Sequence, residues 1–285
     1  MTDISLSSTP FNDRDLHPAL DAIAAAGFTN IEISSAPPHL DKPLEGADLE
    51  TLKRGLAERG FTGCTIHAPM RENTPGAPEE DWRREKVGVI SQYLRVAGAL
   101  GARGLIIHTV PNPIFVDDPT RPELRQIMQD NTRRSLDELV SVARREGARM
   151  LLENLPYATQ YDCDYPFLNM TELRPLVDEY PSEALGLIVD TGHAWTAGID
   201  PTAEIRTAGK RLGGTHLQDV DYENPSDNHW MPTAGGLDWP AIRAALTEVD
   251  YKGHWTYEVI HSRKGETPEE LAEATWETVK DWGPE

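Results

Sequence analysis

The stretch "LIVDTGHAW", residues 187–195, joins an apolar run to a group of polar side chains. Leu187, Ile188 and Val189 are typical of a strand buried on both faces, as in parallel sheets that are covered by helices. The run stops at Asp190, and His193 follows three residues later. The rest of the sequence indicates whether these two residues are incidental or form part of a metal site.

Eight segments of this kind recur along the chain, separated by segments with helical periodicity. The candidate strands are residues 3–9, 29–35, 62–69, 102–110, 148–156, 184–193, 213–220 and 253–260. Strand and helix in strict alternation predict parallel strands joined by crossover helices. Eight such units favour an α/β fold, a closed (β/α)8 TIM barrel, as a single domain over residues 1–285. The alternative is an open doubly wound sheet, but "SLSSTPFND" lacks the glycine-rich phosphate turn typical of that fold.

Residues typical of helix ends support this division. The helical segments 15–27, 47–60 and 137–147 each close on glycine, a common helix stop. Two later helices are expected to begin at Asp238 and Thr267, each an N-cap residue with proline close behind it.

The amino-acid composition indicates which binding partners and which cellular compartment are expected for this protein. The 47 acidic and 27 basic residues give a net charge of −20, which disfavours nucleic acid and anionic membranes as partners. Two cysteines are too few for a disulfide framework, and the N-terminus lacks the pattern of a signal peptide, so we expect a cytoplasmic protein. No apolar run approaches the ~20 residues that span a bilayer. The sequence leaves open whether the protein is a monomer or a homo-oligomer.

Nine metal-competent side chains follow the ends of the predicted strands, where the active sites of barrel enzymes lie. They are His67, His108, Glu153, Asp190, His193, His216, Asp227, His229 and Glu258. A single histidine at a strand end is more often a hydrogen-bonded structural residue than a ligand. Nine such groups at one rim instead indicate a shared site. The other histidines, His17, His39, His254 and His261, are assigned surface or capping roles.

Three of these side chains, Glu153, Asp190 and Glu258, are carboxylates that would be buried near one axis. Each costs several kcal/mol unless it is paired or bound to a cation. The strand-end motifs contain no lysine or arginine to neutralise them. Mixed imidazole and carboxylate ligands suit Mn²⁺, Zn²⁺ or Co²⁺ better than Ca²⁺. We therefore expect Asp190 and His193 to be ligands held by a tight turn at Gly192.

Four motifs resemble the xylose-isomerase-like barrel superfamily: "LLENLP", "VDTGHAWTAGIDP", "HLQDVDYENPSDNHWMPTAGGLDW" and "YKGHWTYEV". That group contains sugar phosphate isomerases and epimerases, inosose dehydratases and abasic-site endonucleases of the endonuclease IV type. The resemblance to the epimerase branch implies one divalent ion held by Glu153, Asp190, His216 and Glu258, with the two glutamates as the acid–base pair. The endonuclease branch binds three zinc ions. The further ligands that this branch implies are present as well: His67, His108, His193, Asp227 and His229.

The loops favour a small polyhydroxy substrate over duplex DNA. A nuclease rim needs lysine and arginine for phosphates, yet "DVDYENPSDNHWMPTAGG" carries four acids and no basic residue. Arg71 and the pair Arg263–Lys264 are the only obvious groups near the rim that would hold an anion. Trp195 and Trp230 offer apolar faces to a sugar ring, and Arg263 is a further candidate for substrate binding.

The resemblance and the site together predict a divalent-metal-dependent sugar or sugar phosphate isomerase or epimerase. It would act by proton transfer next to a metal-bound carbonyl, with Glu153 and Glu258 as acid and base. The cofactor is expected to be one to three ions of Mn, Zn or Co. The five additional residues would hold further metal or contact substrate. An abasic-site endonuclease and a dehydratase or lyase acting on keto-polyols are the alternatives.

Overall fold

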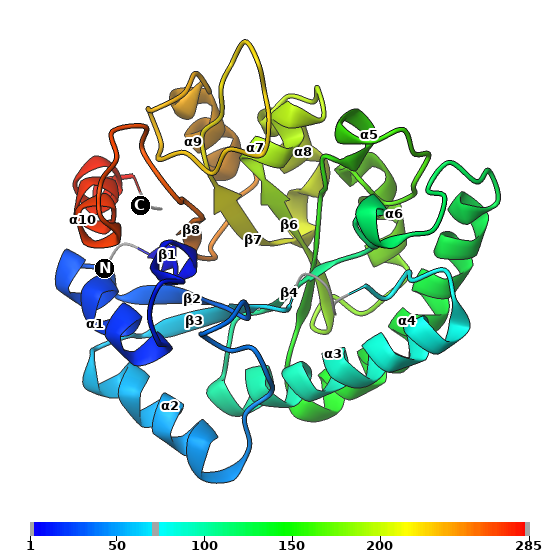
Figure 1. The fold of residues 1–285 in the computed structure, drawn as a ribbon, viewed down its shortest axis with the longest axis horizontal. Helices are drawn as coiled ribbons and strands as arrows, with labels where there is room; N and C mark the ends of the chain where they lie inside the picture. The colour runs from blue at the N-terminus through cyan, green and yellow to red at the C-terminus, as the bar shows by residue number, and fades with distance from the viewer. Residues whose placement is uncertain (1–2, 70–73, 283–285) are drawn as a thin grey trace.

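Eight parallel strands close into a barrel in the order β1 to β8, and β8 pairs with β1 (Figure 1). The structure is a computed structural model that describes residues 3–69 and 74–282. The predicted TIM barrel is therefore confirmed. The strands are β1 (Ile4–Ser7), β2 (Asn30–Ser34), β3 (Gly63–His67), β4 (Leu105–His108), β5 (Met150–Glu153), β6 (Leu185–Asp190), β7 (Leu212–Leu217) and β8 (Trp255–Tyr257).

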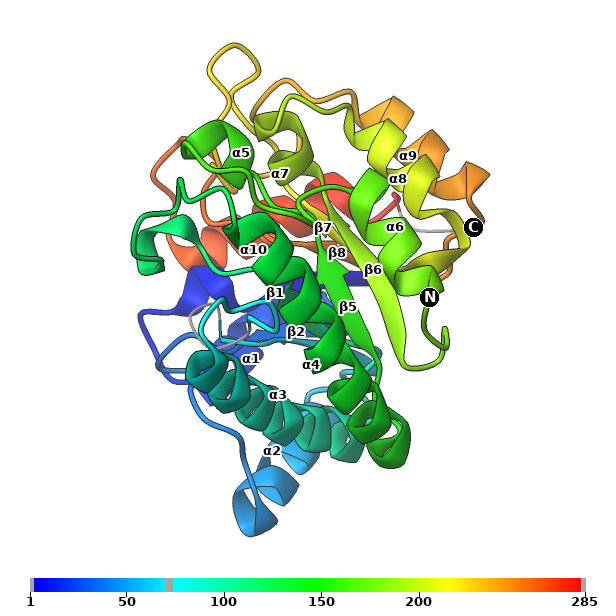
Figure 2. The same cartoon turned by 90° about the vertical axis from the view of Figure 1, so that its right-hand side faces the viewer.

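Helices surround the barrel, and each crossover returns the chain to the next parallel strand (Figure 1). Figure 2 shows α3 and α4 lying side by side along the outside. The helices described here include none long and apolar enough to cross a membrane. The main helices are α1 (Leu16–Ala26), α2 (Gly46–Glu58), α3 (Glu80–Leu100), α4 (Leu124–Glu146), α6 (Met170–Asp178), α8 (Pro201–Ala208), α9 (Trp239–Glu248) and α10 (Pro268–Val279).

The expected helix ends are present where the sequence carries a clear signal. Gly27 and Gly147 take left-handed backbone angles immediately after α1 and α4. The Asp238 side chain accepts a hydrogen bond from Ala241 N at the start of α9. Thr267 and Glu270 form a capping box that begins α10.

Short additional elements interrupt the regular alternation, so the expectation that nothing else lies between strand and helix is wrong. They are η1 (Thr9–Phe11), η2 (Pro113–Phe115), α5 (Tyr157–Gln160), α7 (Thr191–Thr196) and η3 (Gly209–Arg211). Figure 2 shows the segment between β7 and α9 projecting on the same side as α5 and α7. Four of these five elements follow the carboxyl end of a strand, where loops build the mouth of the barrel.

The predicted strand 184–193 ends at Asp190, and α7 begins at once. Asp190 Oδ1 accepts a hydrogen bond from His193 N at 2.6 Å and caps this helix. Gly192 therefore lies inside a helical turn, and the expected tight turn is wrong. Glycine is required there because a Cβ would lie 2.5 Å from the carboxamide carbon of Gln218.

The alternation of side chains along the strands carries polar groups to one level of the barrel. Ile106, Leu151 and Ile188 form a buried apolar cluster on β4, β5 and β6. Because successive side chains point to opposite faces, the residue two positions later on each strand faces the same way. Those residues are His108, Glu153 and Asp190. The apolar layer thus lies directly beneath the candidate site.

Glu204 is a buried acid on α8, outside the barrel. Its Oε2 accepts a hydrogen bond from Met170 N at 2.9 Å. Burial raises the pKa of Glu204 from 4.5 to about 7. Between these pH values the unfolded chain has lost this proton while the folded chain keeps it, so the free energy of unfolding falls as pH rises.

We expect Glu204→Gln to flatten the loss of stability between pH 5 and pH 8. The wild-type penalty at pH 8 is about 2–3 kcal/mol, from the size of the pKa shift. Urea unfolding at both pH values measures it, with the exposed Glu50→Gln as control. Equal pH dependence in Glu204→Gln and wild type would contradict the assignment.

Candidate metal centre

Four buried side chains converge at the carboxyl ends of the last four strands. One ligand atom from each lies within 4.8 Å of the others, and the residues are Glu153, Asp190, His216 and Glu258. His216 Nδ1 lies 2.8 Å from Glu153 Oε1, 3.2 Å from Glu258 Oε2 and 3.9 Å from Asp190 Oδ2. In-register pairing of β6 and β7 places Asp190 beside His216. The structure therefore brings together the four residues that were expected to hold one ion.

The charges in this cluster are strongly coupled. Although burial lowers the pKa of the His216 imidazole, the carboxylates of Glu32, Glu258 and Glu153 raise it well above its ordinary value. Burial acts to raise the pKa of Glu153, but His216, His108 and His67 hold it well below its usual range. Burial raises the pKa of Glu258 against the opposing effect of His216 and His229. One imidazole thus faces four carboxylates, those of Glu32, Glu153, Asp190 and Glu258.

This set of donors fits a divalent cation. Glu153 Oε2 is fully buried, and its nearest partners among the described residues are the Nε2 atoms of His108 and His67 at 3.3 and 3.5 Å, which do not form well-aligned hydrogen bonds. A carboxylate oxygen left in that state is costly unless a cation compensates it. Three carboxylates and one imidazole are the mixture that suits first-row transition ions.

Glu32 on β2 is a further member of the cluster that sequence reasoning missed. Its Oε2 lies 2.9 Å from His216 Nε2, and both side chains are fully buried. The second nitrogen of a metal-bound histidine is commonly held by a carboxylate in this way. The available signal was an acidic residue inside the apolar strand "NIEIS", away from any strand end.

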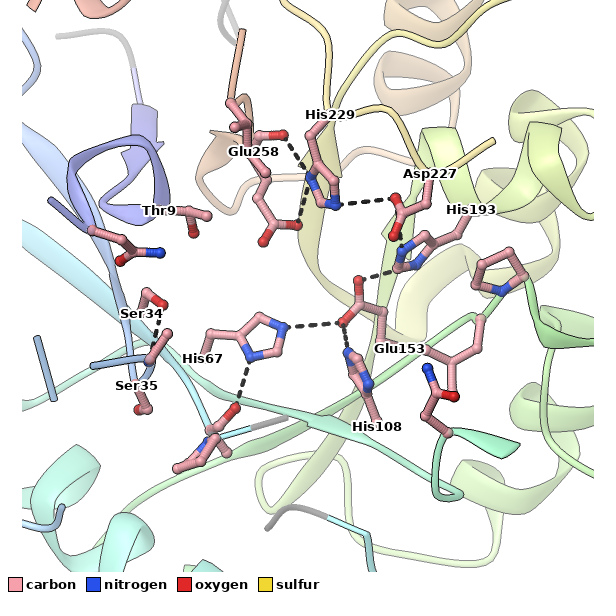
Figure 3. Close-up of a pocket in the computed structure, with 18 of the residues that line it drawn as sticks. Thr9, Ser34, Ser35, His67, His108, Glu153, His193, Asp227, His229 and Glu258 are labelled. Carbon is pink, nitrogen blue, oxygen red and sulfur yellow. Dashed lines mark hydrogen bonds and ion pairs between the residues drawn. The ribbon is translucent and has the colours of Figure 1, made fainter. Parts of the chain in front are cut away.

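A second group lies beside the first. His193, Asp227 and His229 also place ligand atoms within 4.8 Å of one another. Asp227 Oδ1 is 3.4 Å from His193 Nε2 and 3.0 Å from His229 Nε2. Figure 3 shows these side chains and Glu258 around one pocket.

His67 and His108 reach the same pocket from β3 and β4. Their Nε2 atoms lie 3.5 and 3.3 Å from Glu153 Oε2 (Figure 3). Glu153 therefore faces His216 through one oxygen and these two histidines through the other. All five additional residues named from the sequence meet around this one cavity.

Two amides hold these ligands in place, and neither was singled out from the sequence. Asn154 exchanges two hydrogen bonds with the Asp190 backbone, at 2.8 and 3.0 Å. Gln218 Nε2 donates to Asp190 and Asp227, and Gln218 Oε1 accepts from His229 N at 2.7 Å. These amides link the two clusters through neutral groups.

Asp219 fixes the segment that carries Asp227 and His229. It is fully buried. Its Oδ1 accepts hydrogen bonds from the backbone N–H groups of three residues, and its Oδ2 accepts two more. The donors are Val220, Gly236 and Leu237 for Oδ1, and Thr233 N and Trp239 Nε1 for Oδ2.

The cavity above the clusters has a volume of about 650 Å³. Its wall, within the described part of the chain, includes none of the three residues predicted to bind substrate. Trp195 stacks on Tyr222 with ring centroids 4.7 Å apart, and the Arg263 guanidinium lies 4.3 Å from the centre of the Trp230 ring. These side chains pack on each other and not on the cavity. Arg71 lies outside the described residues.

Polar and apolar side chains line the cavity together. Hydroxyl and amide groups come from Thr9, Asn12, Ser34, Asn112 and Gln160, and apolar wall from Ala36, Pro37, Leu155, Pro156 and Ile260. Most of these residues lie in short loops after the strands. The hydrophobic periodicity of the sequence does not predict which loop residues line a cavity. Such a mixture suits a ligand with several hydroxyl groups and a carbon skeleton.

Two other histidines depart from expectation. His39 is buried, and its ring nitrogens lie 3.0 Å from Ser8 Oγ and 3.1 Å from Phe11 O. His254 is buried as well, against Gly63. Of the surface or capping roles expected for these residues, a surface position is wrong for both, because each ring is buried between packed elements. His261 is exposed, and His17 is half-buried.

Comparisons with known proteins agree with this architecture. Residues 20–282 match the family model described as xylose isomerase-like TIM barrel. The fructoselysine 3-epimerase of Escherichia coli O157:H7 is 24% identical over 82% of this chain and 82% of its own. The uncharacterized protein y4fM of Sinorhizobium fredii is 26% identical, over 88% and 83%. A crystal structure of D-psicose 3-epimerase in the presence of D-fructose superposes with a TM-score of 0.80 at 16% identity, covering 98% of both chains.

At 16% identity, the likeness to the solved structure shows the fold alone. The family model spans the strands that carry both clusters. The match begins within α1 and ends after α10. The expected superfamily resemblance is therefore confirmed. This chain belongs to the xylose isomerase-like TIM barrel family.

Proposed function

We propose that this protein is a divalent-metal-dependent isomerase or epimerase that acts on a ketose or keto-polyol. The observation that carries the proposal is the convergence of Glu153, Asp190, His216 and Glu258 beneath an open cavity. Relatives named as fructoselysine 3-epimerase and D-psicose 3-epimerase support a sugar substrate. The mixed polar and apolar wall of the cavity supports the same class.

Glu153, Asp190, His216 and Glu258 would hold the ion, of the Mn²⁺, Zn²⁺ or Co²⁺ class. When bound, a divalent ion supplies Lewis-acid polarisation of a substrate carbonyl, which acidifies the neighbouring C–H. Asp190 is suited to a purely binding role, because His193 N, Gln218 Nε2 and the Asn154 amide restrain it. His216 is restrained by Glu32.

Glu153 and Glu258 then act as the acid–base pair. One removes the proton from the carbon next to the carbonyl, and the other returns a proton. Delivery to the opposite face of the same carbon inverts that centre, whereas delivery to the neighbouring carbon isomerises the sugar. His67 and His108 lie close to Glu153 Oε2. They would form hydrogen bonds with the substrate hydroxyls next to Glu153.

A second candidate is an abasic-site endonuclease with three zinc ions. The cluster of His193, Asp227 and His229 favours it, because it offers a second group of ligands beside the first. The net charge of −20 weighs against a DNA substrate. A dehydratase or lyase acting on keto-polyols would use the same proton abstraction, followed by loss of a β-hydroxyl.

Deuterium exchange tests the proposal whichever product the enzyme forms. The purified protein is incubated in D₂O with a panel containing D-fructose, D-psicose, D-tagatose and L-ribulose, and NMR follows deuterium at carbons next to the carbonyl. We expect exchange with at least one sugar. A parallel incubation uses a duplex with an abasic site. Incision of that duplex with no exchange in the panel would favour the nuclease.

Metal content provides an independent prediction. We expect at least one transition ion per chain, and removal by chelator should lower the free energy of unfolding by about 3–4 kcal/mol, as for a ligand present at 100 to 1,000 times its Kd. Elemental analysis and thermal unfolding measure both effects. Three tightly held zinc ions would support the nuclease, and a metal-free protein with unchanged stability would refute the metal site.

A further inference from the structure

Arg149 is a half-buried cation that pairs with no acid among the described residues. It lies just before β5, and its Nε is buried and donates no hydrogen bond to any described residue. Burial lowers the pKa of Arg149, and the neighbouring Arg211 lowers it further. Arg211 is a second cation; it donates to the carbonyl oxygens of Val177 and Tyr180 and adds to the positive charge near Arg149. The guanidinium is thus unpaired within residues 3–69 and 74–282, in a protein whose net charge is −20.

The Arg149 side chain lines a second cavity of about 550 Å³. Four cationic residues line it, Arg103, Arg149, Lys210 and Lys252, together with one acid, Asp250. Lys252 Nζ lies 2.8 Å from Asp250 Oδ1, and Arg103 Nη2 lies 3.6 Å from Asp3 Oδ1, so Arg149 and Lys210 are the two cations of this wall that pair with no acid among the described residues. The cavity concentrates positive charge in a molecule whose net charge is strongly negative.

This cavity lies at the end of the barrel opposite the candidate metal centre. Its wall comes from residues at the amino ends of β4, β5, β7 and β8, whereas the metal cluster lies at the carboxyl ends. Four residues separate Arg149 from Glu153 along β5, which at the rise of a strand is about 13 Å. The apolar layer of Ile106, Leu151 and Ile188 lies between the two levels.

Two glycines make room for the guanidinium. A Cβ at Gly186 would lie 2.4 Å from Arg149 Nη2, and a Cβ at Gly213 would lie 2.8 Å from Nη1. The second residues of β6 and β7 thus lack side chains where the Arg149 fork lies. The fork lies in the space that these glycines leave, and the hydrogen bonds found among the described residues include none from its Nη groups.

We propose that this basic cavity binds a small molecule that carries a phosphate group. A phosphate monoester brings nearly two negative charges and three acceptor oxygens, which match several converging cations better than a single carboxylate does. The planar arginine fork recognises phosphate through two parallel hydrogen bonds. The volume admits a phosphorylated metabolite as well as the free ion.

Calorimetric titration of the full-length protein tests the site. The probes are inorganic phosphate, pyrophosphate, glucose 6-phosphate and citrate, at matched ionic strength. We expect saturable binding of at least one phosphate compound, and binding should be weaker by roughly tenfold to a hundredfold in Arg149→Met. Lys210→Met, an exposed change at the cavity edge, should also weaken binding and keeps the test valid if Arg149→Met does not fold.

Matched controls separate this site from the metal centre and from general charge. Arg54→Met removes the same charge on the exposed surface of α2 and should leave binding unchanged. Glu153→Gln should bind the phosphate compound as wild type does. The proposal is overturned if no phosphate compound binds, if only citrate binds, or if affinity survives unchanged in both Arg149→Met and Lys210→Met.

Discussion

Glu153→Gln and Glu258→Gln should each lower kcat on any accepted ketose by about 10³-fold, within the range that general acid–base catalysis contributes. Glutamine keeps the shape of the side chain and one oxygen ligand but cannot take up or release the proton. Both carboxylates lie within 3.2 Å of His216 Nδ1, at the floor of the cavity in which the proposed substrate would bind. Steady-state kinetics and the exchange assay in D₂O measure the effect.

Controls distinguish lost proton transfer from lost metal. Glu58→Gln, an exposed change on α2, should leave turnover unchanged. Elemental analysis of each variant shows whether the ion is still bound. A variant at position 153 or 258 that retains its metal and more than half of wild-type turnover would refute the acid–base role of that residue.

Asp219→Ala should cost about 3 kcal/mol or more in the free energy of unfolding, because hydrogen bonds to a charged group contribute about 1.5–3 kcal/mol each and do not add fully. The substitution leaves up to five donors without their acceptor in a buried place. It should also lower turnover, since the freed segment carries Asp227 and His229. Urea unfolding and kinetics check the two effects.

Asp219→Asn should lie between alanine and wild type. Its oxygen can still accept three hydrogen bonds, but its NH₂ group would face Thr233 N and Trp239 Nε1, which are donors themselves. The exposed Asp117→Asn serves as the matched control. If Asp219→Ala unfolds at the same urea concentration as this control, Asp219 does not secure the segment.

The fold was predictable because barrel strands are buried on both faces and are short. The apolar runs ending at His67, His108, Glu153 and Asp190 coincide with β3 to β6, and each marks a strand end where a site is built. Parallel register then brings residues from distant segments to one level, as with His108 and Glu153. At these positions the apolar pattern and the residue types were sufficient to predict both the strand ends and the candidate site residues.

The residues that were missed or misassigned lack such a signal. Glu32 lies in the middle of its strand, and its contact with His216 depends on which face of β2 points inward. Trp195 lies in the short helix α7, and Trp230 and Arg263 lie in loops; the stacking of Trp195 on Tyr222 and of Arg263 on Trp230 depends on tertiary packing. The segment Thr191–Thr196 was taken for strand and turn, but it forms the helix α7. Its N-cap is Asp190, which is also the last residue of β6 and a member of the candidate metal cluster.

The apolar side chains of Ile106, Leu151 and Ile188 lie between Arg149 and the candidate metal centre on β4, β5 and β6. Substitutions more than about 7–10 Å apart that share no partners usually have additive effects. Changes made on either side of this layer, such as Arg149→Met and Glu153→Gln, can therefore be combined without altering each other's consequences. We therefore expect that the proposed phosphate site at the base and the proposed reaction at the mouth can be engineered separately.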